Sequence, residues 1–304
     1  MSILIILCKR LVSMFLFMFV GAVLHKRNYI SEEGSKSLGN LLIRLSLPCV
    51  ILKAFQVERS PERIQALLLS IVFSMLLLSA AILISRIFFV NDPIGHFAAA
   101  FSNPGFFGIP LIYAVLNDEA VFYVAPFIAC LNILQWTYGT AVLTEKKLKI
   151  EWKNIVLSPF MIAFLLGLTL FLAEIDLPEI LDVVIENSAN MNTPLAMLVS
   201  GVYMAKVDFR AMLTSRKLYA VTVVRLLVNA AVAGLILSLL PGSRYTLKMC
   251  LFIAAACPVG SNVAVYAQLH GRDYVYAVET VVLSTFISVV TLPLTVYVIQ
   301  YVYG

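Results

Sequence analysis

The sequence predicts an all-α integral membrane protein with ten transmembrane helices, arranged as two inverted five-helix repeats. Of the 304 residues, 61% are hydrophobic and only 13% are charged, and the mean hydropathy is +0.95. A soluble domain is roughly half apolar and a quarter charged. Lipid solvates so much apolar surface directly, whereas a water-soluble fold has no place to bury it. A third observation, two matching helix interruptions, predicts the repeats.

Apolar runs of spanning length recur along the whole chain, and short polar segments separate them. They predict helices at 4–25, 37–56, 64–90, 95–117, 119–143, 153–174, 188–206, 215–240, 246–270 and 274–302. Lys9 and Arg10 interrupt the first run, and the seventh opens with the polar run 187–194. No loop is long enough for a soluble domain, so we expect one membrane domain over 1–304. Its first repeat is 1–144 and its second is 152–304.

The distribution of lysine and arginine predicts the orientation. Of the 22 basic residues, thirteen fall on one set of loops and seven on the opposite set, where the predicted loop 174–186 is purely acidic. Because basic loops stay in the cytoplasm, both termini are expected on the extracytoplasmic side. The net charge of +5 then reflects cytoplasmic loops rather than nucleic-acid binding. We expect a multi-pass protein of the cytoplasmic (inner) membrane.

Two predicted helices are interrupted at matching places. The fourth contains the segment 103–110, and the ninth contains 257–262. Proline lacks an N–H group, glycine makes departure from the helix cheap, and asparagine can cap the helix that restarts. Pro104 and Pro258 are 154 residues apart, close to half the chain. Five helices per half make the second repeat inverted, so the two broken helices should cross near the middle of the membrane.

This crossing is the predicted binding site. A helix that restarts inside the membrane exposes N–H groups with partial positive charge, which favours an anion by roughly 0.3–2 kcal/mol. Amide side chains can donate to a carboxylate and accept from a hydroxyl. The candidate substrate-binding residues are Asn103, Pro104, Gly105, Gly108, Pro110, Asn132, Gln135, Pro258, Gly260, Ser261 and Asn262, with Phe106, Phe107 and Tyr266 beside an apolar part of the substrate. The alternative is that the asparagines only cap helices.

Three ionisable residues fall inside predicted helices: Arg44, Arg225 and Glu279. Such residues are costly in lipid and are therefore functional candidates. Arg44 lies about two turns from the predicted cytoplasmic end and can extend to the interface. Arg225 and Glu279 enter from the same side. Either they form a pair that joins two helices, or Glu279 carries a coupling proton.

Other chemistries are not supported by the sequence. The three histidines are scattered, the five cysteines form no C-x-x-C pattern, and no P-loop is present. Nothing resembles the serine–histidine or paired-aspartate set of a membrane enzyme. We therefore expect no enzymatic activity, no catalytic residues, no metal site, no disulfide and no cofactor.

The interruptions and other motifs resemble the auxin efflux carrier family, in order and along the whole chain. The long cytoplasmic loop of many plant members is missing, which points to a bacterial-type member. The third helix lacks the acid or lysine of some plant carriers, so auxin itself is not the expected substrate. The matching segments are Asn103 with Gly108-Ile109-Pro110-Leu111, Ala255-Ala256-Cys257-Pro258-Val259-Gly260 through Tyr266-Ala267, Leu131-Asn132-Ile133-Leu134-Gln135-Trp136, Ser46-Leu47-Pro48, Ser158-Pro159 with Leu165-Leu166-Gly167, Gly201-Val202-Tyr203-Met204-Ala205, and Arg225 in the eighth helix.

The resemblance implies a secondary transporter, a permease or efflux carrier that works by alternating access. Helices 1, 2, 6 and 7 would form a scaffold, and helices 3–5 and 8–10 a transport unit that carries the substrate at the crossing. With the site chemistry, this predicts small organic anions, carboxylates above all, as substrates. Expected partners are that anion and membrane lipid, with no nucleic acid; a homodimer through the scaffold helices stays open. The alternatives are a non-transporting sensor or receptor on the same fold and a sodium-coupled symporter.

Overall fold

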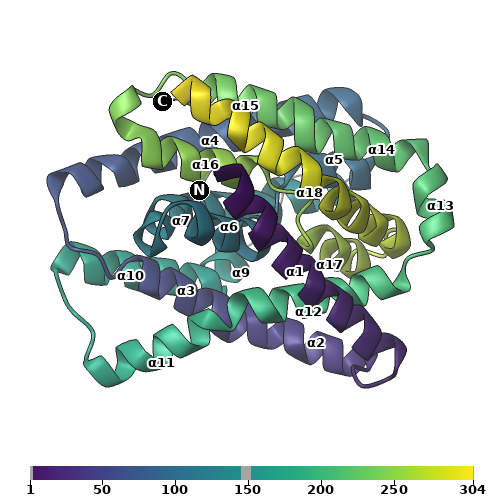
Figure 1. The fold of residues 1–304 in the computed structure, drawn as a ribbon, viewed down its shortest axis with the longest axis horizontal. Helices are drawn as coiled ribbons and strands as arrows, with labels where there is room; N and C mark the ends of the chain where they lie inside the picture. Colours follow the sequence, from purple (N-terminus) through teal and green to yellow (C-terminus); the bar gives the residue numbers. More distant parts are fainter. Residues whose placement is uncertain (1–2, 145–151, 304) are drawn as a thin grey trace.

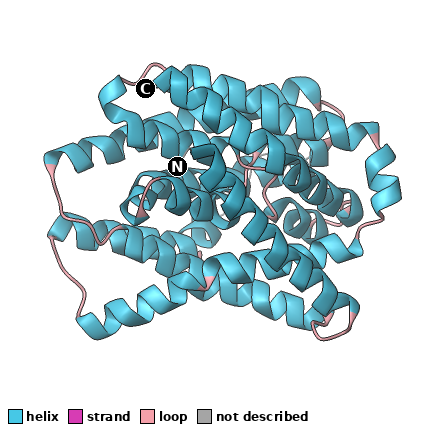
Figure 2. Ribbon diagram, in the orientation of Figure 1, coloured by secondary structure: helices cyan, strands magenta, loops and turns pink. Residues whose placement is uncertain are grey.

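The computed structural model describes residues 3–144 and 152–303, and every regular element in these ranges is a helix (Figure 2). The segment between the two predicted repeats, 145–151, lies outside the described residues. Six helical segments are long and apolar enough to cross a membrane: Ile3–Lys26, Glu32–Ala54, Pro61–Phe88, Asp118–Thr144, Arg216–Leu237 and Tyr274–Tyr303. Pro104–Val115 and Pro159–Ala173 are shorter apolar helices. The all-α membrane class is confirmed, and the count of ten spans stays a prediction.

Several helices in the first half of the chain begin where a polar side chain caps them. Ser31, Ser60 and Asp92 each accept a backbone N–H three residues on, which satisfies a donor that the first helical turn leaves free. The elements are α1 (Ile3–Lys26), α2 (Glu32–Leu41), η1 (Leu42–Ser46), α3 (Leu47–Ala54), α4 (Pro61–Phe88), α5 (Pro93–Ala100), η2 (Pro104–Gly108), α6 (Ile109–Val115), η3 (Asp118–Ala120), α7 (Val121–Leu134), η4 (Gln135–Gly139) and α8 (Thr140–Thr144).

In the second half of the chain, one segment predicted as a loop is partly helical. The acidic segment 174–186 is helical from Glu179 onward, because Glu179 and Asp182 occupy the first turn of a helix, where carboxylates are favourable. The elements are α9 (Trp152–Val156), α10 (Pro159–Ala173), α11 (Glu179–Asn190), α12 (Asn192–Lys206), α13 (Phe209–Thr214), α14 (Arg216–Val223), η5 (Val224–Val228), α15 (Asn229–Leu237), η6 (Gly242–Arg244), α16 (Tyr245–Ala256), α17 (Asn262–Leu269) and α18 (Tyr274–Tyr303).

The helices pack as two groups. In the smaller group (α1, α2, α3, α10, α11 and α12), α1 lies along α12, while α3 packs against α10 and α11. The larger group consists of α4–α8 and α14–α18, in which α4 packs on α5 and α7, and α16 on α15 and α18. In Figure 1 most of the smaller group lies below and the larger group above, with α1 crossing between them.

Two glycines let α1 and α12 touch through their backbones. A Cβ atom at Gly201 would collide with the carbonyl oxygen of Met18, and one at Gly21 with that of Leu198. Small residues at these positions allow two membrane helices to approach closely and gain van der Waals contact. This contact ties the first predicted repeat to the second within the smaller group.

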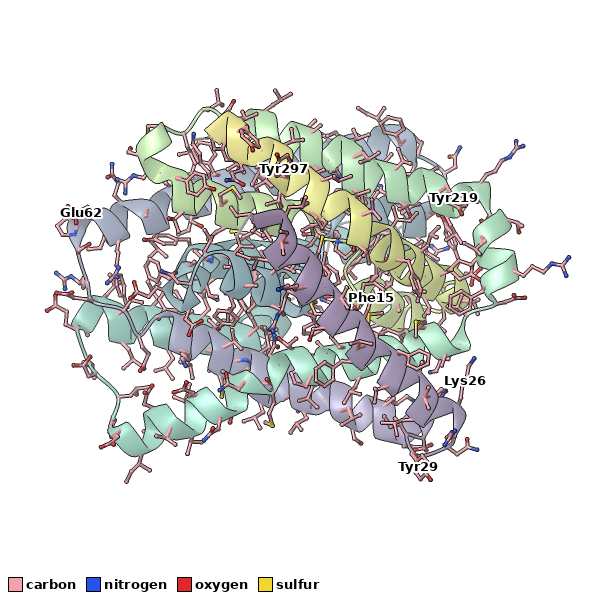
Figure 3. The ribbon with its side chains drawn as sticks, in the orientation of Figure 1. Phe15, Lys26, Tyr29, Glu62, Tyr219 and Tyr297 are labelled. Atoms are coloured by element: carbon pink, nitrogen blue, oxygen red, sulfur yellow. The ribbon has the colours of Figure 1, made fainter. Side chains whose placement is uncertain are left out.

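Three labelled residues lie at the ends of the protein that the predicted topology gives them. In Figure 3, Lys26 and Tyr219 lie toward the right, whereas Glu62 lies at the opposite, left end. Lys26 and Tyr219 belong to segments that the basic residues place in the cytoplasm, and Glu62 to one on the other side. Which end faces the cytoplasm stays a prediction.

Candidate substrate site at the helix crossover

The two interrupted segments meet through extended backbone. Helix α5 ends at Ala100 and α16 ends at Ala256, and beyond these ends Ser102 and Val259 form an antiparallel β-bridge. The N–H of Asn103 donates to the carbonyl of Pro258, and the N–H of Gly260 to that of Phe101, both at 3.0 Å. The interruptions predicted from proline, glycine and asparagine are therefore the points where the broken segments touch. We call this region, 101–108 and 257–262, the crossover.

Gly260 permits this close approach. A Cβ atom there would lie 2.7 Å from the carbonyl oxygen of Ser102, too near for any other residue. Gly108 is less demanding, because a Cβ there would lie 3.1 Å from the Sγ atom of Cys257. The backbones of the two segments thus pack directly on each other.

The two asparagines connect segments rather than cap helices. The Nδ2 of Asn103 donates to the Oγ of Ser261 at 3.2 Å, and that of Asn262 to the Oε1 of Gln135 at 2.8 Å. Neither η2 nor α17 has a side-chain cap. The capping expectation is therefore wrong. In η2, the backbone carbonyl of Asn103 already accepts the N–H groups of Phe107 and Gly108.

Gln135 and Asn132 were both predicted at the site, and the structure separates them. Gln135 is 0% exposed, and its Nε2 donor has no partner among the described residues. Asn132 donates instead to the carbonyl of Ile128, one turn back in its own helix, at 2.9 Å. Gln135 thus contacts the crossover through Asn262, whereas the side chain of Asn132 stabilises α7.

Several backbone donors at the crossover remain available. At the starts of η2 and α17, four N–H groups have no acceptor among the described residues: those of Gly105, Phe106, Ser261 and Asn262. Such groups carry the partial positive charge of a helix N-terminus. They could hold an anion. The described residues contain no group of three or more His, Cys, Asp or Glu that could hold a metal ion.

Arg225 occupies the opposite ends of the same broken helices. Its guanidinium donates to the carbonyls of Ala99 and Ala100, each at 3.0 Å, and also to the carbonyl of Ala255. One turn along, Asn229 donates to Ala99 at 2.8 Å. Arg225 is only 2% exposed. Each helix C-terminus is equivalent to about half a negative charge, so the ends of α5 and α16 together offset one arginine.

The predicted pair of Arg225 and Glu279 does not form. Glu279 is half-buried on α18, and no ion pair joins it to Arg225. Its charged neighbours are Asp208 and Asp273. The guanidinium is already bonded to helix-end carbonyls, which supply the negative potential that a carboxylate was expected to supply.

A cavity leads to the crossover from one face of the protein. This vestibule has a volume of about 610 Å³ and lies between α2 and α12 on one wall and η2 and α17 on the other. Phe106, Ser261 and Asn262 line it at the crossover, and Lys36 of α2 and Lys206, the last residue of α12, also line it. It follows α2 and η1 from Glu32 to Ile43, about 16 Å at 1.5 Å per residue.

The other two predicted aromatic residues lie elsewhere. Phe107 and Tyr266 are buried and do not line the vestibule. Tyr266 instead packs against Phe97 and Trp136, with ring centroids 5.4 Å apart in both cases. Of the three aromatics, Phe106 alone borders the vestibule within the described residues.

Asn192, the first residue of α12, was not predicted as a site residue. It is 2% exposed, and its Nδ2 donates to the carbonyl of Gly105 at 3.1 Å. The available signal was the polar run 187–194, which we interpreted only as a weak start to a helix. Lys36 and Lys206 were counted only as loop charges, because nothing in the sequence shows that their helices border a cavity.

A comparison with known families identifies the chain. A family described as membrane transport protein matches it in two successive regions, residues 6–154 and 143–296. The chain belongs to this membrane transport protein family. Auxin efflux carriers are members, so the resemblance inferred from the motifs is confirmed. The family is one of transport rather than catalysis, and its apolar helices make this member a multi-pass membrane protein. A comparison with curated proteins gives no match.

Proposed function

We propose that this member of the family is a secondary transporter that moves small organic anions, carboxylates above all, by alternating access. The observation that carries the proposal is the vestibule, which reaches Ser261 and Asn262 at the start of α17. Unpartnered N–H groups and a side-chain amide meet there in a site that water and a solute can enter. A carboxylate can accept hydrogen bonds from both the backbone N–H groups and the side-chain amide.

The charges around the site support an anion. Arg225 offsets the negative ends of α5 and α16, so the positive ends of η2 and α17 remain uncompensated near the vestibule. Lys206 is paired with Glu32 at 2.6 Å, whereas Lys36 is exposed on the vestibule wall and forms no salt bridge among the described residues. Glu32 also lines the vestibule, so the wall carries two lysines against one carboxylate, and this excess of positive charge raises the local concentration of anions.

The shape of the vestibule supports an organic substrate. Its volume of about 610 Å³ lies within the range of about 300–1,000 Å³ that small-molecule sites occupy. Apolar side chains form much of its wall: Leu42, Ile43, Phe106, Ala196, Val199 and Val265. A carboxylate with a compact apolar body therefore suits it better than an inorganic anion.

Alternating access is the proposed mechanism, with the smaller group as scaffold and the larger group as the moving unit. The antiparallel pairing of Ser102 with Val259 supports two inverted repeats, since such repeats bring equivalent segments together in opposite directions. Both broken helices belong to the larger group, so the substrate would travel with it. The vestibule would be the path from the cytoplasmic side.

The test is uptake of radiolabelled mono- and dicarboxylates into proteoliposomes that contain the purified protein. We expect at least one carboxylate to be taken up, and its neutral amide analogue to be excluded. At a hundred times its dissociation constant, that carboxylate should also stabilise the folded protein by about 2.7 kcal/mol. Absence of both uptake and stabilisation across the series would refute the carboxylate assignment.

A further inference from the structure

The π-helical turn η2 is followed by Pro110, which removes the backbone donor that would continue its hydrogen-bond pattern. Within this turn the N–H of Ile109 donates to the carbonyl of Pro104, five residues back. The next bond of the same pattern would run from residue 110 to the carbonyl of Gly105. Proline has no N–H group, so Pro110 cannot make it. A buried carbonyl without a hydrogen-bond partner is unfavourable.

Asn192 supplies the missing donor. Its Nδ2 lies 3.1 Å from the carbonyl oxygen of Gly105, and the side chain is almost completely buried. Asn192 belongs to the smaller group, whereas Gly105 belongs to the crossover of the larger group. Nearby, Leu47 of the smaller group also covers Gly105, since a Cβ there would lie 3.4 Å from its Cδ1.

Elsewhere the two groups meet through apolar rings. Phe15 of α1 packs on Phe286 of α18, and Phe55, which follows α3, packs on Phe122 of α7, with ring centroids 5.5 Å apart in both pairs. Contacts of this kind are less directional than hydrogen bonds, so two surfaces can slide across each other without breaking specific hydrogen bonds. The hydrogen bond from Asn192 is directional and specific to one arrangement.

We infer that Asn192 holds the crossover against the smaller group and stabilises the arrangement in which the vestibule is open. This inference rests on the proposed alternating access, because it concerns the relative movement of the two groups. When the larger group moves, the carbonyl of Gly105 loses Asn192 and has no backbone donor to replace it. Asn192 is a positioning residue that sets the balance between conformations.

The experiment measures the distance between the two walls of the vestibule. Spin labels are attached at Lys36→Cys on α2 and Gln268→Cys on α17, which line opposite walls, in a Cys8→Ser background because Cys8 is the exposed native cysteine. Pulsed electron resonance on the protein in lipid nanodiscs gives the populations of long and short distances. With Asn192→Leu, we expect the ratio of short to long distances to rise roughly tenfold, the equivalent of one buried hydrogen bond.

Ser46→Ala is the matched control. It also removes a buried side-chain bond to a carbonyl, from Ser46 Oγ to Ser188 at 2.8 Å, but both residues belong to the smaller group. The distance ratio should therefore stay as in the parent. An equal shift in both variants would show general loosening and would overturn the inference, as would no shift with Asn192→Leu.

A second variant tests the cause. Pro110→Ala restores an N–H group that can bond to the carbonyl of Gly105, so Asn192→Leu should change the ratio much less in this background. An undiminished effect would overturn the inference.

The measurement uses no substrate. If carboxylate uptake fails while the distance shift is found, the proposed substrate is wrong and the role of Asn192 stands.

Discussion

Ser102 and Val259 form the antiparallel bridge by which the two broken helices are held together. Each lies just before the helix that restarts, in opposite halves of the chain. The pairing brings together two residues 157 positions apart in sequence, and it depends on backbones that touch. The glycine next to the bridge is the first place to test it.

Gly260→Ala should damage the crossover. The added Cβ would lie 2.7 Å from the carbonyl oxygen of Ser102, so the bridge must open. We expect a loss of about 1–3 kcal/mol of stability, as for other overpacked sites, and strongly reduced transport. Thermal unfolding and uptake measure the two effects. The control is Gly242→Ala, where nothing lies within 4 Å of the new atom and both properties should be unchanged.

Asn262→Ala and Asn103→Ala should reduce transport strongly while the protein still folds. Asn262 lines the vestibule and bonds to Gln135, and Asn103 bonds to Ser261 across the crossover. Because neither side chain caps a helix, its removal should leave the helices intact. Asn132→Ala is the control, since Asn132 bonds only within its own helix. Normal uptake in both crossover variants would move the site elsewhere.

Arg225→Met should destabilise the protein by about 3 kcal/mol or more, because the buried carbonyls of Ala100 and Ala255 lose the guanidinium and that of Ala99 keeps only Asn229. Arg225→Lys should destabilise the protein less than Arg225→Met. Lysine keeps the positive charge, but its ammonium group cannot donate to the C-terminal carbonyls of both helices in the planar geometry of a guanidinium. Melting temperatures of the two variants, with and without Glu279→Gln, provide the measurement. Rescue of Arg225→Met by Glu279→Gln would reveal a charge pair that the structure does not contain.

Glu279→Gln alone should leave the stability within about 0.5 kcal/mol of the parent, since Glu279 forms no ion pair among the described residues. Its remaining hypothetical role is to carry a coupling proton. In that role, the variant should lose accumulation driven by a pH gradient but keep substrate exchange, which needs no net proton movement. Undiminished accumulation would exclude Glu279 from coupling.

The topology predicts opposite sides for Lys217, which is exposed, and Asp182, which is half-buried. A cysteine at Lys217 should react with an impermeant thiol reagent only from the cytoplasm, and one at Asp182 only from outside. Reaction of both from the same side would contradict the inverted arrangement of the repeats. Lys147, the other predicted cytoplasmic marker, lies outside the described residues.

The positions of the helix breaks could be predicted because their cause is local. Pro104, Pro258 and Gly260 impose backbone constraints that hold in any fold, and an apolar run on each side makes the interruption visible. The membrane class could also be predicted, because a water-soluble fold cannot bury a chain of which 61% of the residues are hydrophobic. The family resemblance rested on the same local motifs.

The partners of the polar side chains could not be predicted, because packing decides them. Arg225 looked like half of a charge pair, since the sequence shows charged side chains but not the partial charges at helix ends. Asn192 and Gly105 are 87 residues apart, and only the approach of the two helix groups brings the amide to the carbonyl that Pro110 leaves free. The sequence alone determined where the helices break and that they lie in lipid. The tertiary structure decided which buried groups satisfy the broken ends, because in a dry interior each must find a donor or acceptor within reach.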